Sequence, residues 1–172
     1  MEIAKTHGLE AIVFPEMSLT GYDRTPAVEL IFSENDHRIQ ALVLKCQELN
    51  IHATVSVPLK INNAFYIASF HIDKSGQINV YTKTYLHGGE DVFFTPGKHN
   101  PISTIDNWNV GFAICADVSH PEHARRAGDN KVQIYLVSAF VTEEGFQKDA
   151  DALSRYAAQH RFVSVFSNFC GN

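Results

Sequence analysis

Basic residues are scarce in this sequence. Its 172 residues include 14 Lys and Arg against 19 Asp and Glu, which gives a net charge of -5 with neutral histidines. A protein that binds nucleic acid needs a concentrated basic surface to hold phosphates. The one adjacent arginine pair, Arg125 and Arg126, is better explained as part of a solvated helix face. We therefore expect no nucleic-acid partner.

Cysteine and long apolar runs are also scarce. The three cysteines, Cys46, Cys115 and Cys170, are odd in number and far apart, which is not the pattern of a disulfide framework. Residues 1–8 contain no apolar core of a signal peptide, and no stretch approaches the ~18 consecutive apolar residues of a membrane-spanning helix. These features predict a cytoplasmic protein with no membrane partner.

The sequence contains no internal repeat, low-complexity linker or shift in composition. With 45% hydrophobic residues it can bury one sizeable core, so we expect a single domain over residues 1–172. Continuous apolar or β-branched runs predict strands, and apolar residues at helical spacing predict helices. The predicted strands are residues 11–14, 52–57, 64–72, 78–81, 102–105, 109–114, 133–138 and 162–167, and the predicted helices are 36–50, 143–160 and one beginning near 119.

Local signals refine these elements. The turn at residues 73–76 predicts that the strands on either side of it form an antiparallel hairpin. Ser33 or Asn35 is the expected N-cap of helix 36–50, and the Ser119-x-x-Glu122 spacing is that of a capping box. Strands that alternate with helices in the C-terminal half favour a layered α/β fold.

Three ionisable residues lie just past predicted strands. Glu16 follows strand 11–14, Lys83 follows strand 78–81, and Cys115 follows strand 109–114. The ends of strands are where α/β proteins place their reactive groups. Cys46, by contrast, falls on the apolar stripe of helix 36–50, so we expect it in the core.

These three residue types are sufficient for acyl transfer. A thiol becomes a useful nucleophile when its pKa falls or when a base takes its proton, and Glu16 is a candidate base. Attack on a carbonyl or nitrile carbon places negative charge on oxygen or nitrogen, which fixed donors stabilise. Lys83 and the backbone N–H of Ala116 are the candidate donors.

The sequence resembles the nitrilase superfamily of carbon–nitrogen hydrolases. The order and the separations of the matching stretches carry the resemblance. They are Phe14-Pro15-Glu16 with Leu19-Thr20-Gly21-Tyr22, Lys83-Thr84-Tyr85-Leu86, and Gly111-Phe112-Ala113-Ile114-Cys115-Ala116-Asp117 with Pro121-Glu122, supported by Glu90, Phe94, Pro96-Gly97, residues 157–168 and Gly171.

The resemblance implies a role for each motif residue. Cys115 would be the nucleophile, Glu16 the general base, Lys83 the stabiliser of the tetrahedral intermediate, and Glu90 a second acid that positions substrate or relays protons. The implied reaction is hydrolysis of a small-molecule amide or carbamoyl compound through a thioester, with no cofactor and no metal. The implied fold is a four-layer α-β-β-α sandwich with mixed sheets, paired into a homodimer or larger homo-oligomer.

The sequence departs from the family pattern in two respects. The family's opening strand and most of its long first helix are missing before the stretch that contains Glu16. Its closing strands are missing at the other end, so we expect a domain incomplete at both ends. Family members that act on nitriles typically have Trp and Glu after the cysteine. This chain has Ala116 and Asp117, which favours an amide or carbamoyl substrate over a nitrile.

Three alternatives remain open from the residues. Cys115 can instead pair with His87 or His120 in a Cys–His hydrolase. A truncated or inactive family member would serve as a binding or oligomerising domain. The His120-x-x-His123 spacing suggests a zinc site, but no further Cys or His pair completes it.

Overall fold

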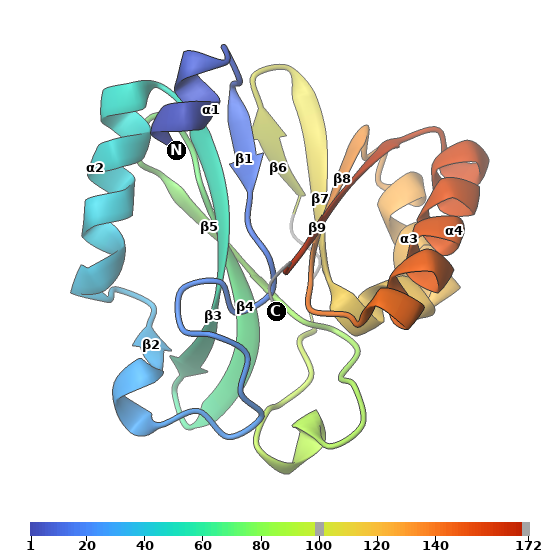
Figure 1. Cartoon of the computed structure of the whole chain (residues 1–172), viewed down its shortest axis with the longest axis horizontal. Coiled ribbons are helices and arrows are strands. Elements are labelled where there is room, and N and C mark those ends of the chain that lie inside the picture. The colour runs from blue at the N-terminus through green and yellow to red at the C-terminus, as the bar shows by residue number, and fades with distance from the viewer. Residues whose placement is uncertain (99–101, 170–172) are drawn as a thin grey trace.

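A computed structural model of the chain describes residues 1–98 and 102–169. Two β-sheets lie face to face, and helices cover the outer face of each (Figure 1). The predicted four-layer α-β-β-α sandwich with mixed sheets is therefore confirmed. Of the motif residues, Gly171 lies outside the described residues, as does Cys170.

The first sheet has the strand order β1-β3-β4-β5, with β2 paired to β3. Strand β3 is parallel to β1 and β2 and antiparallel to β4, and β4 is antiparallel to β5. The hairpin predicted between β4 and β5 is present, closed by the Asp73 carboxylate, which accepts from the N–H groups of Ser75 and Gln77. The strands are β1 (Ala11–Val13), β2 (Phe32–Ser33), β3 (His52–Ile61), β4 (Ala64–Ile72) and β5 (Ile78–Thr82).

The second sheet has the order β6-β7-β8-β9. Strands β7, β8 and β9 are parallel, and the crossovers between them contain helices, as parallel neighbours require. Their C-terminal ends therefore share one edge of the sheet. The elements are β6 (Ile102–Ile105), β7 (Trp108–Ile114), α3 (Pro121–Asp129), β8 (Ile134–Ala139), α4 (Glu143–His160) and β9 (Val163–Asn168).

The outer face of the first sheet carries α1 (Glu2–Thr6) and α2 (Gln40–Leu49). The segment predicted as helix 36–50 begins instead as a 3-10 turn, η2 (His37–Ile39). The expected caps were wrong: Asp36 caps this turn, because it directly precedes the turn and its carboxylate accepts from the N–H of Arg38. Cys46 is fully buried in the core, as predicted.

The predicted capping box of α3 is also wrong. Ser119 ends a 3-10 turn, η4 (Cys115–Ser119), and the N-cap of α3 is His120, which makes no side-chain cap. The Glu122 carboxylate pairs with the neighbouring arginines on the exposed face of the helix. Two further 3-10 turns are η1 (Val28–Leu30) and η3 (Glu90–Val92).

Three apolar layers hold the sandwich together. One lies between the sheets, one between α2 and the first sheet, and one between the second sheet and helices α3 and α4. The layer between the sheets includes Ile67, Tyr81, Phe112, Ile114 and Leu136. No helix among residues 1–98 and 102–169 is long and apolar enough to cross a membrane.

Candidate active site

Glu16 lies in the loop that follows β1 and crosses toward the second sheet. Its backbone N–H donates to the carbonyl of Ala139, the last residue of β8, at 3.3 Å. The residue is 2% exposed. Its Oε1 atom contacts a cation, whereas its Oε2 atom is buried and has no hydrogen-bond partner in the described part of the chain. One carboxylate oxygen is therefore available to accept a proton.

Lys83 follows β5 directly and is held by the backbone on both sides. Its N–H donates to the carbonyl of Ile67 on β4 at 2.8 Å, and its carbonyl accepts from the N–H of Gly97 at 2.7 Å. A Cβ at Gly97 would lie 2.3 Å from the carbonyl oxygen of Thr82, so this close approach requires glycine. The Lys83 side chain is fully buried.

Cys115 follows β7 and begins the turn η4. Its φ of 44° lies in the left-handed region, which is uncommon for a residue with a side chain and is often found at functional sites. The Sγ atom lies 3.8 Å from the carbonyl oxygen of Phe140, to which the thiol donates. The chain thus holds the sulfur at the end of a buried strand, as the sequence predicted.

The structure brings Glu16, Lys83 and Glu90 together in one buried cluster. The Lys83 Nζ atom lies 2.8 Å from Oε1 of Glu16 and 2.8 Å from Oε1 of Glu90. Two N–H groups of the ammonium are occupied in this way, and the third remains for another acceptor.

The cluster and the thiol affect one another electrostatically. Burial raises the pKa of Glu16 to about 7, although Lys83 opposes the shift. Burial favours the neutral form of Lys83, but the Glu16 carboxylate, the Cys115 sulfur and Glu90 together raise its pKa above the usual range. Burial and then the Glu16 charge raise the pKa of Cys115 to about 12. The thiol is therefore protonated near neutrality, so it would act as a nucleophile only if a nearby base took its proton.

Glu90 is oriented by three donors. Besides Lys83, the Tyr22 hydroxyl donates to its Oε1 at 2.7 Å, and the N–H of His87 donates to its Oε2 at 2.7 Å. The residue begins the turn η3 and is fully buried. Its carboxylate consequently fixes both the ammonium and the loop that carries Tyr22.

Asp117 joins the stretch that begins at Lys83 to the stretch that contains Cys115. Its Oδ1 accepts from the N–H groups of Thr84 and Tyr85, at 3.2 and 2.8 Å, directly after Lys83. Its Oδ2 accepts from the N–H of Ile114 at 2.8 Å and from the Tyr81 hydroxyl at 2.5 Å. Asp117 is fully buried, so it acts on the site through the backbone on both sides.

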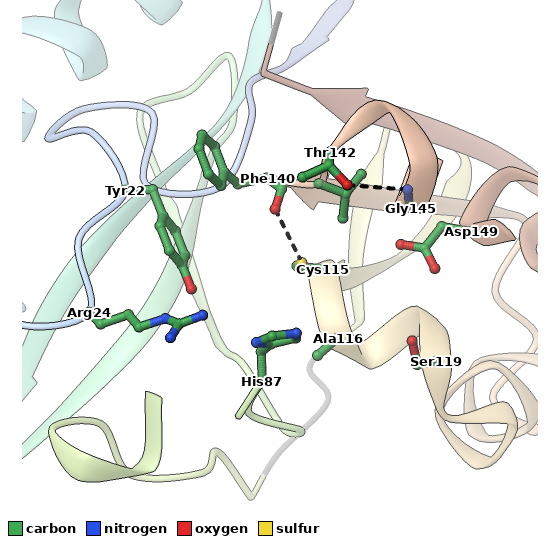
Figure 2. Close-up of a pocket in the computed structure, with 11 residues that line it drawn as sticks. Tyr22, Arg24, His87, Cys115, Ala116, Ser119, Phe140, Thr142, Gly145 and Asp149 are labelled. Atoms are coloured by element: carbon green, nitrogen blue, oxygen red, sulfur yellow. Dashed lines mark hydrogen bonds between the residues drawn. The ribbon is translucent and has the colours of Figure 1, made fainter. Parts of the chain in front are cut away.

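A cavity of about 340 Å³ opens beside the sulfur. Figure 2 shows Cys115 between two walls of this cavity, one carrying Tyr22, Arg24 and His87 and the other carrying Thr142, Gly145 and Asp149. Ala116 also lines it. The volume lies in the range of small-molecule sites.

The histidines of the alternative hypotheses occupy different places. His87 lines the cavity, whereas Nδ1 of His120 lies 2.9 Å from the carbonyl oxygen of Ala116 and its ring stacks on Tyr85. His123 is buried, with Nε2 at 2.9 Å from the Tyr81 hydroxyl. Within the described ranges no group of three or more His, Cys, Asp or Glu residues is arranged to hold a metal ion.

Sequence reasoning missed several residues of the site. The motif that contains Tyr22 gives no sign that its hydroxyl contacts Glu90, and the sequence around Asp117 does not predict the contacts of its carboxylate. Arg24 and Asp149 line the cavity, but neither follows a predicted strand or belongs to one of the family motifs. No signal in a single sequence identifies such residues, because only the packing of loop and helix brings them beside Cys115.

Comparison with known proteins agrees with this architecture. The model of the family described as "Carbon-nitrogen hydrolase" matches residues 1–171. An amidase of the nitrilase superfamily from Nesterenkonia AN1 has a similar structure, with a TM-score of 0.86 and 21% identity, and the match covers 99% of this chain and 67% of that one. At this identity the likeness establishes the fold.

Curated relatives share more of the sequence. A protein of Pseudomonas protegens named "Hydrolase in pqqF 5'region" is 29% identical over 170 residues, which cover 95% of this chain and 59% of the relative. The 2-oxoglutaramate amidase of Bacillus subtilis is 25% identical over 134 residues, which cover 76% of this chain and 52% of the relative. The chain thus spans a little over half the length of these two proteins.

Proposed function

Since the chain belongs to the carbon–nitrogen hydrolase family, we propose that it hydrolyses the carbon–nitrogen bond of small linear amides or carbamoyl compounds, with Cys115 as nucleophile. One observation carries the proposal. The Lys83 ammonium lies between the carboxylates of Glu16 and Glu90 in a fully buried cluster. A buried cluster with two carboxylates and one ammonium is costly to a fold. In this chain the charges of the cluster influence the pKa of the Cys115 thiol, which lines the cavity.

Glu16 is the general base of the proposed attack. Its free Oε2 and its pKa of about 7 suit it to accept a proton near neutrality. The Cys115 sulfur attacks the carbonyl carbon as its proton passes to Glu16. The oxyanion that forms accepts hydrogen bonds from the third N–H of Lys83 and from the backbone N–H of Ala116.

Glu16 then returns the proton to the substrate nitrogen. The carbon–nitrogen bond breaks, ammonia or an amine leaves, and a thioester with Cys115 remains. Water attacks the thioester and gives its proton to Glu16, and the carboxylic acid leaves as the thiol is restored. Glu90 keeps the Lys83 ammonium oriented through both steps and touches the Tyr22 hydroxyl at the cavity wall.

The named relatives support amide chemistry. The Bacillus subtilis relative is a 2-oxoglutaramate amidase. One structure of the Nesterenkonia amidase shows covalent addition of the acetamide moiety of fluoroacetamide at the active site cysteine, and another holds butyramide. In this chain the short side chain of Ala116 beside the sulfur is compatible with an amide of similar size.

The test is an ammonia-release screen over matched amides and nitriles. We expect amides to be turned over, Cys115→Ala to abolish turnover, and Glu16→Gln to reduce kcat/KM by about 10²- to 10⁴-fold, the usual contribution of a general base. Mass spectrometry after rapid quenching should detect the acyl group on Cys115. Faster turnover of nitriles than of amides, or turnover that survives Cys115→Ala, would contradict the proposal.

A Cys–His hydrolase is the second candidate, because His87 lines the same cavity as Cys115. Its prediction is opposite to ours. If His87 were the base, His87→Ala would abolish turnover and Glu16→Gln would leave most of it. We expect the reverse order of effects. If the chain bound amides but released no ammonia, the remaining alternative, an inactive family member that serves as a binding domain, would be supported instead.

The assembly state and the location belong to the same proposal. We propose a homodimer or larger homo-oligomer in the cytoplasm, without nucleic acid as partner. Light scattering of the purified chain tests the first point, and a single-subunit mass at micromolar concentration would overturn it.

A further inference from the structure

The cavity holds a carboxylate for which the proposed reaction has no use. Asp149 lies on α4, and in Figure 2 its carboxylate points into the cavity toward Cys115. The residue is only 8% exposed. Within the described part of the chain, its carboxylate makes no hydrogen bond and no ion pair, whereas Asp151 on the same helix is exposed and accepts from Gln147.

The Asp149 carboxylate is largely withdrawn from water, although its oxygens still reach the cavity. Burial raises the pKa of Asp149 because the ionised form loses water, and Lys148 only partly opposes the shift. Buried charges in folded proteins are normally paired or fully hydrogen-bonded. A cationic group in the cavity would supply the missing partner and restore the usual pKa.

The two walls of the cavity differ in their charge. Arg24 and His87 on the facing wall are both exposed to solvent, so water and salt screen them. Asp149 acts from a drier position, where a charge interacts more strongly with a ligand. The charge of Asp149 is therefore screened less than the charges on the facing wall.

We propose that Asp149 is a specificity residue that binds a protonated amine on the substrate, so that the preferred substrates are short amides with an ammonium group at the far end of the acyl chain. This inference rests on the proposed hydrolysis at Cys115 and specifies its substrate class. The amide carbon would lie at the sulfur and the ammonium at the wall formed by α4. A cavity of about 340 Å³ accommodates such a molecule.

The experiment compares two amides of equal size. In 3-aminopropanamide an ammonium replaces the terminal methyl group of butanamide. A hydrogen bond between charged groups contributes about 1.5–3 kcal/mol, or about 10- to 150-fold. We expect kcat/KM for 3-aminopropanamide to exceed that for butanamide by this factor in the wild type, and the ratio to fall to about 1 in Asp149→Asn.

Asp151→Asn is the matched control, since it removes a charge from the exposed face of the same helix. It should leave the ratio of the two kcat/KM values unchanged. A wild-type ratio near 1, a ratio that survives Asp149→Asn, or faster turnover of succinamate, which carries a carboxylate at the same place, would overturn the inference. The last result would assign charge selection to Arg24.

A binding measurement separates this inference from the proposed reaction. In Cys115→Ala, 3-aminopropanamide should bind more tightly than butanamide in calorimetry, and adding Asp149→Asn should remove the difference. If the wild type released no ammonia from any amide, the proposed function would fail while this result still supported Asp149 as an amine-binding residue. Equal binding of both amides, or no binding of either, would contradict it.

Discussion

Asp117→Asn tests whether the motifs are held together as the structure indicates. The Asp117 carboxylate accepts four hydrogen bonds, three from backbone N–H groups and one from the Tyr81 hydroxyl. Asparagine has nearly the same shape but offers one acceptor oxygen, and its NH2 group donates. The variant therefore turns an acceptor into a donor without creating a cavity.

The loss in the free energy of unfolding depends on which of two orientations the new amide group of Asp117→Asn adopts. If the NH2 group replaced Oδ1, the Tyr85 N–H would lose its acceptor, and the Thr84 N–H would keep only its bond to the Tyr81 hydroxyl at 3.3 Å. If it replaced Oδ2, only the Ile114 N–H would be orphaned. The Tyr81 hydroxyl would accept from the amide and donate to Nε2 of His123, 2.9 Å away, once the imidazole proton moves to Nδ1, where the Tyr135 hydroxyl accepts it.

The second orientation is preferred and leaves one buried donor unpaired, which costs about 1–3 kcal/mol. The remaining bonds also lose the strength that a charged acceptor gives them, which brings the total to about 2–4 kcal/mol. For a chain of this size the midpoint of thermal unfolding should fall by about 5–15 °C.

Urea unfolding monitored by circular dichroism measures the difference. Asp91→Asn is the control, because Asp91 is exposed and its replacement should change the free energy of unfolding by no more than about 0.5 kcal/mol. Folded Asp117→Asn should also show lower kcat/KM for amides, since the backbone beside Lys83 and Cys115 is no longer fixed. A free energy of unfolding equal to that of the wild type would refute the argument.

Three further predictions concern the buried cluster. The folded-state pKa of Glu16 is raised from 4.5 to about 7, so its contribution to stability is fully present below pH 4.5 and is lost as the pH rises through 7. Glu16→Gln should therefore flatten the dependence of the unfolding free energy on pH. An unchanged slope of that free energy between pH 5 and 8 would contradict this. Lys83→Met should lower the free energy of unfolding by about 3–5 kcal/mol, because it leaves buried carboxylates uncompensated. Lys60→Met, at an exposed position, should not lower this free energy to the same extent. Calorimetry of the two variants measures the difference. Iodoacetamide should alkylate Cys115, which lines the cavity, well before the fully buried Cys46. Alkylation of Cys115 should be slower after Glu16→Gln. Equal rates at Cys115 and Cys46 in peptide mass spectrometry would count against a reactive thiol.

The sequence predicted the strands that carry the site because continuous apolar runs bounded by Pro, Gly and polar residues are strong local signals. It was less successful at helix ends. Asp36, instead of Ser33 or Asn35, caps the turn before α2, and the Ser119-x-x-Glu122 spacing forms no capping box. Several residues near each end have side chains that can cap, and tertiary contacts decide which one does.

The sequence by itself determined which residue types follow the buried strands, and thereby the candidates Glu16, Lys83 and Cys115. It also determined the family, because motif order and separation are properties of the linear chain. Only the tertiary structure decided that Lys83 lies between two carboxylates, that Asp117 anchors two motifs, and that Asp149 faces the cavity with no partner among residues 1–98 and 102–169. The physical reason is that protonation, burial and hydrogen bonding depend on distances between segments far apart in the chain, and the packing of the two sheets sets those distances.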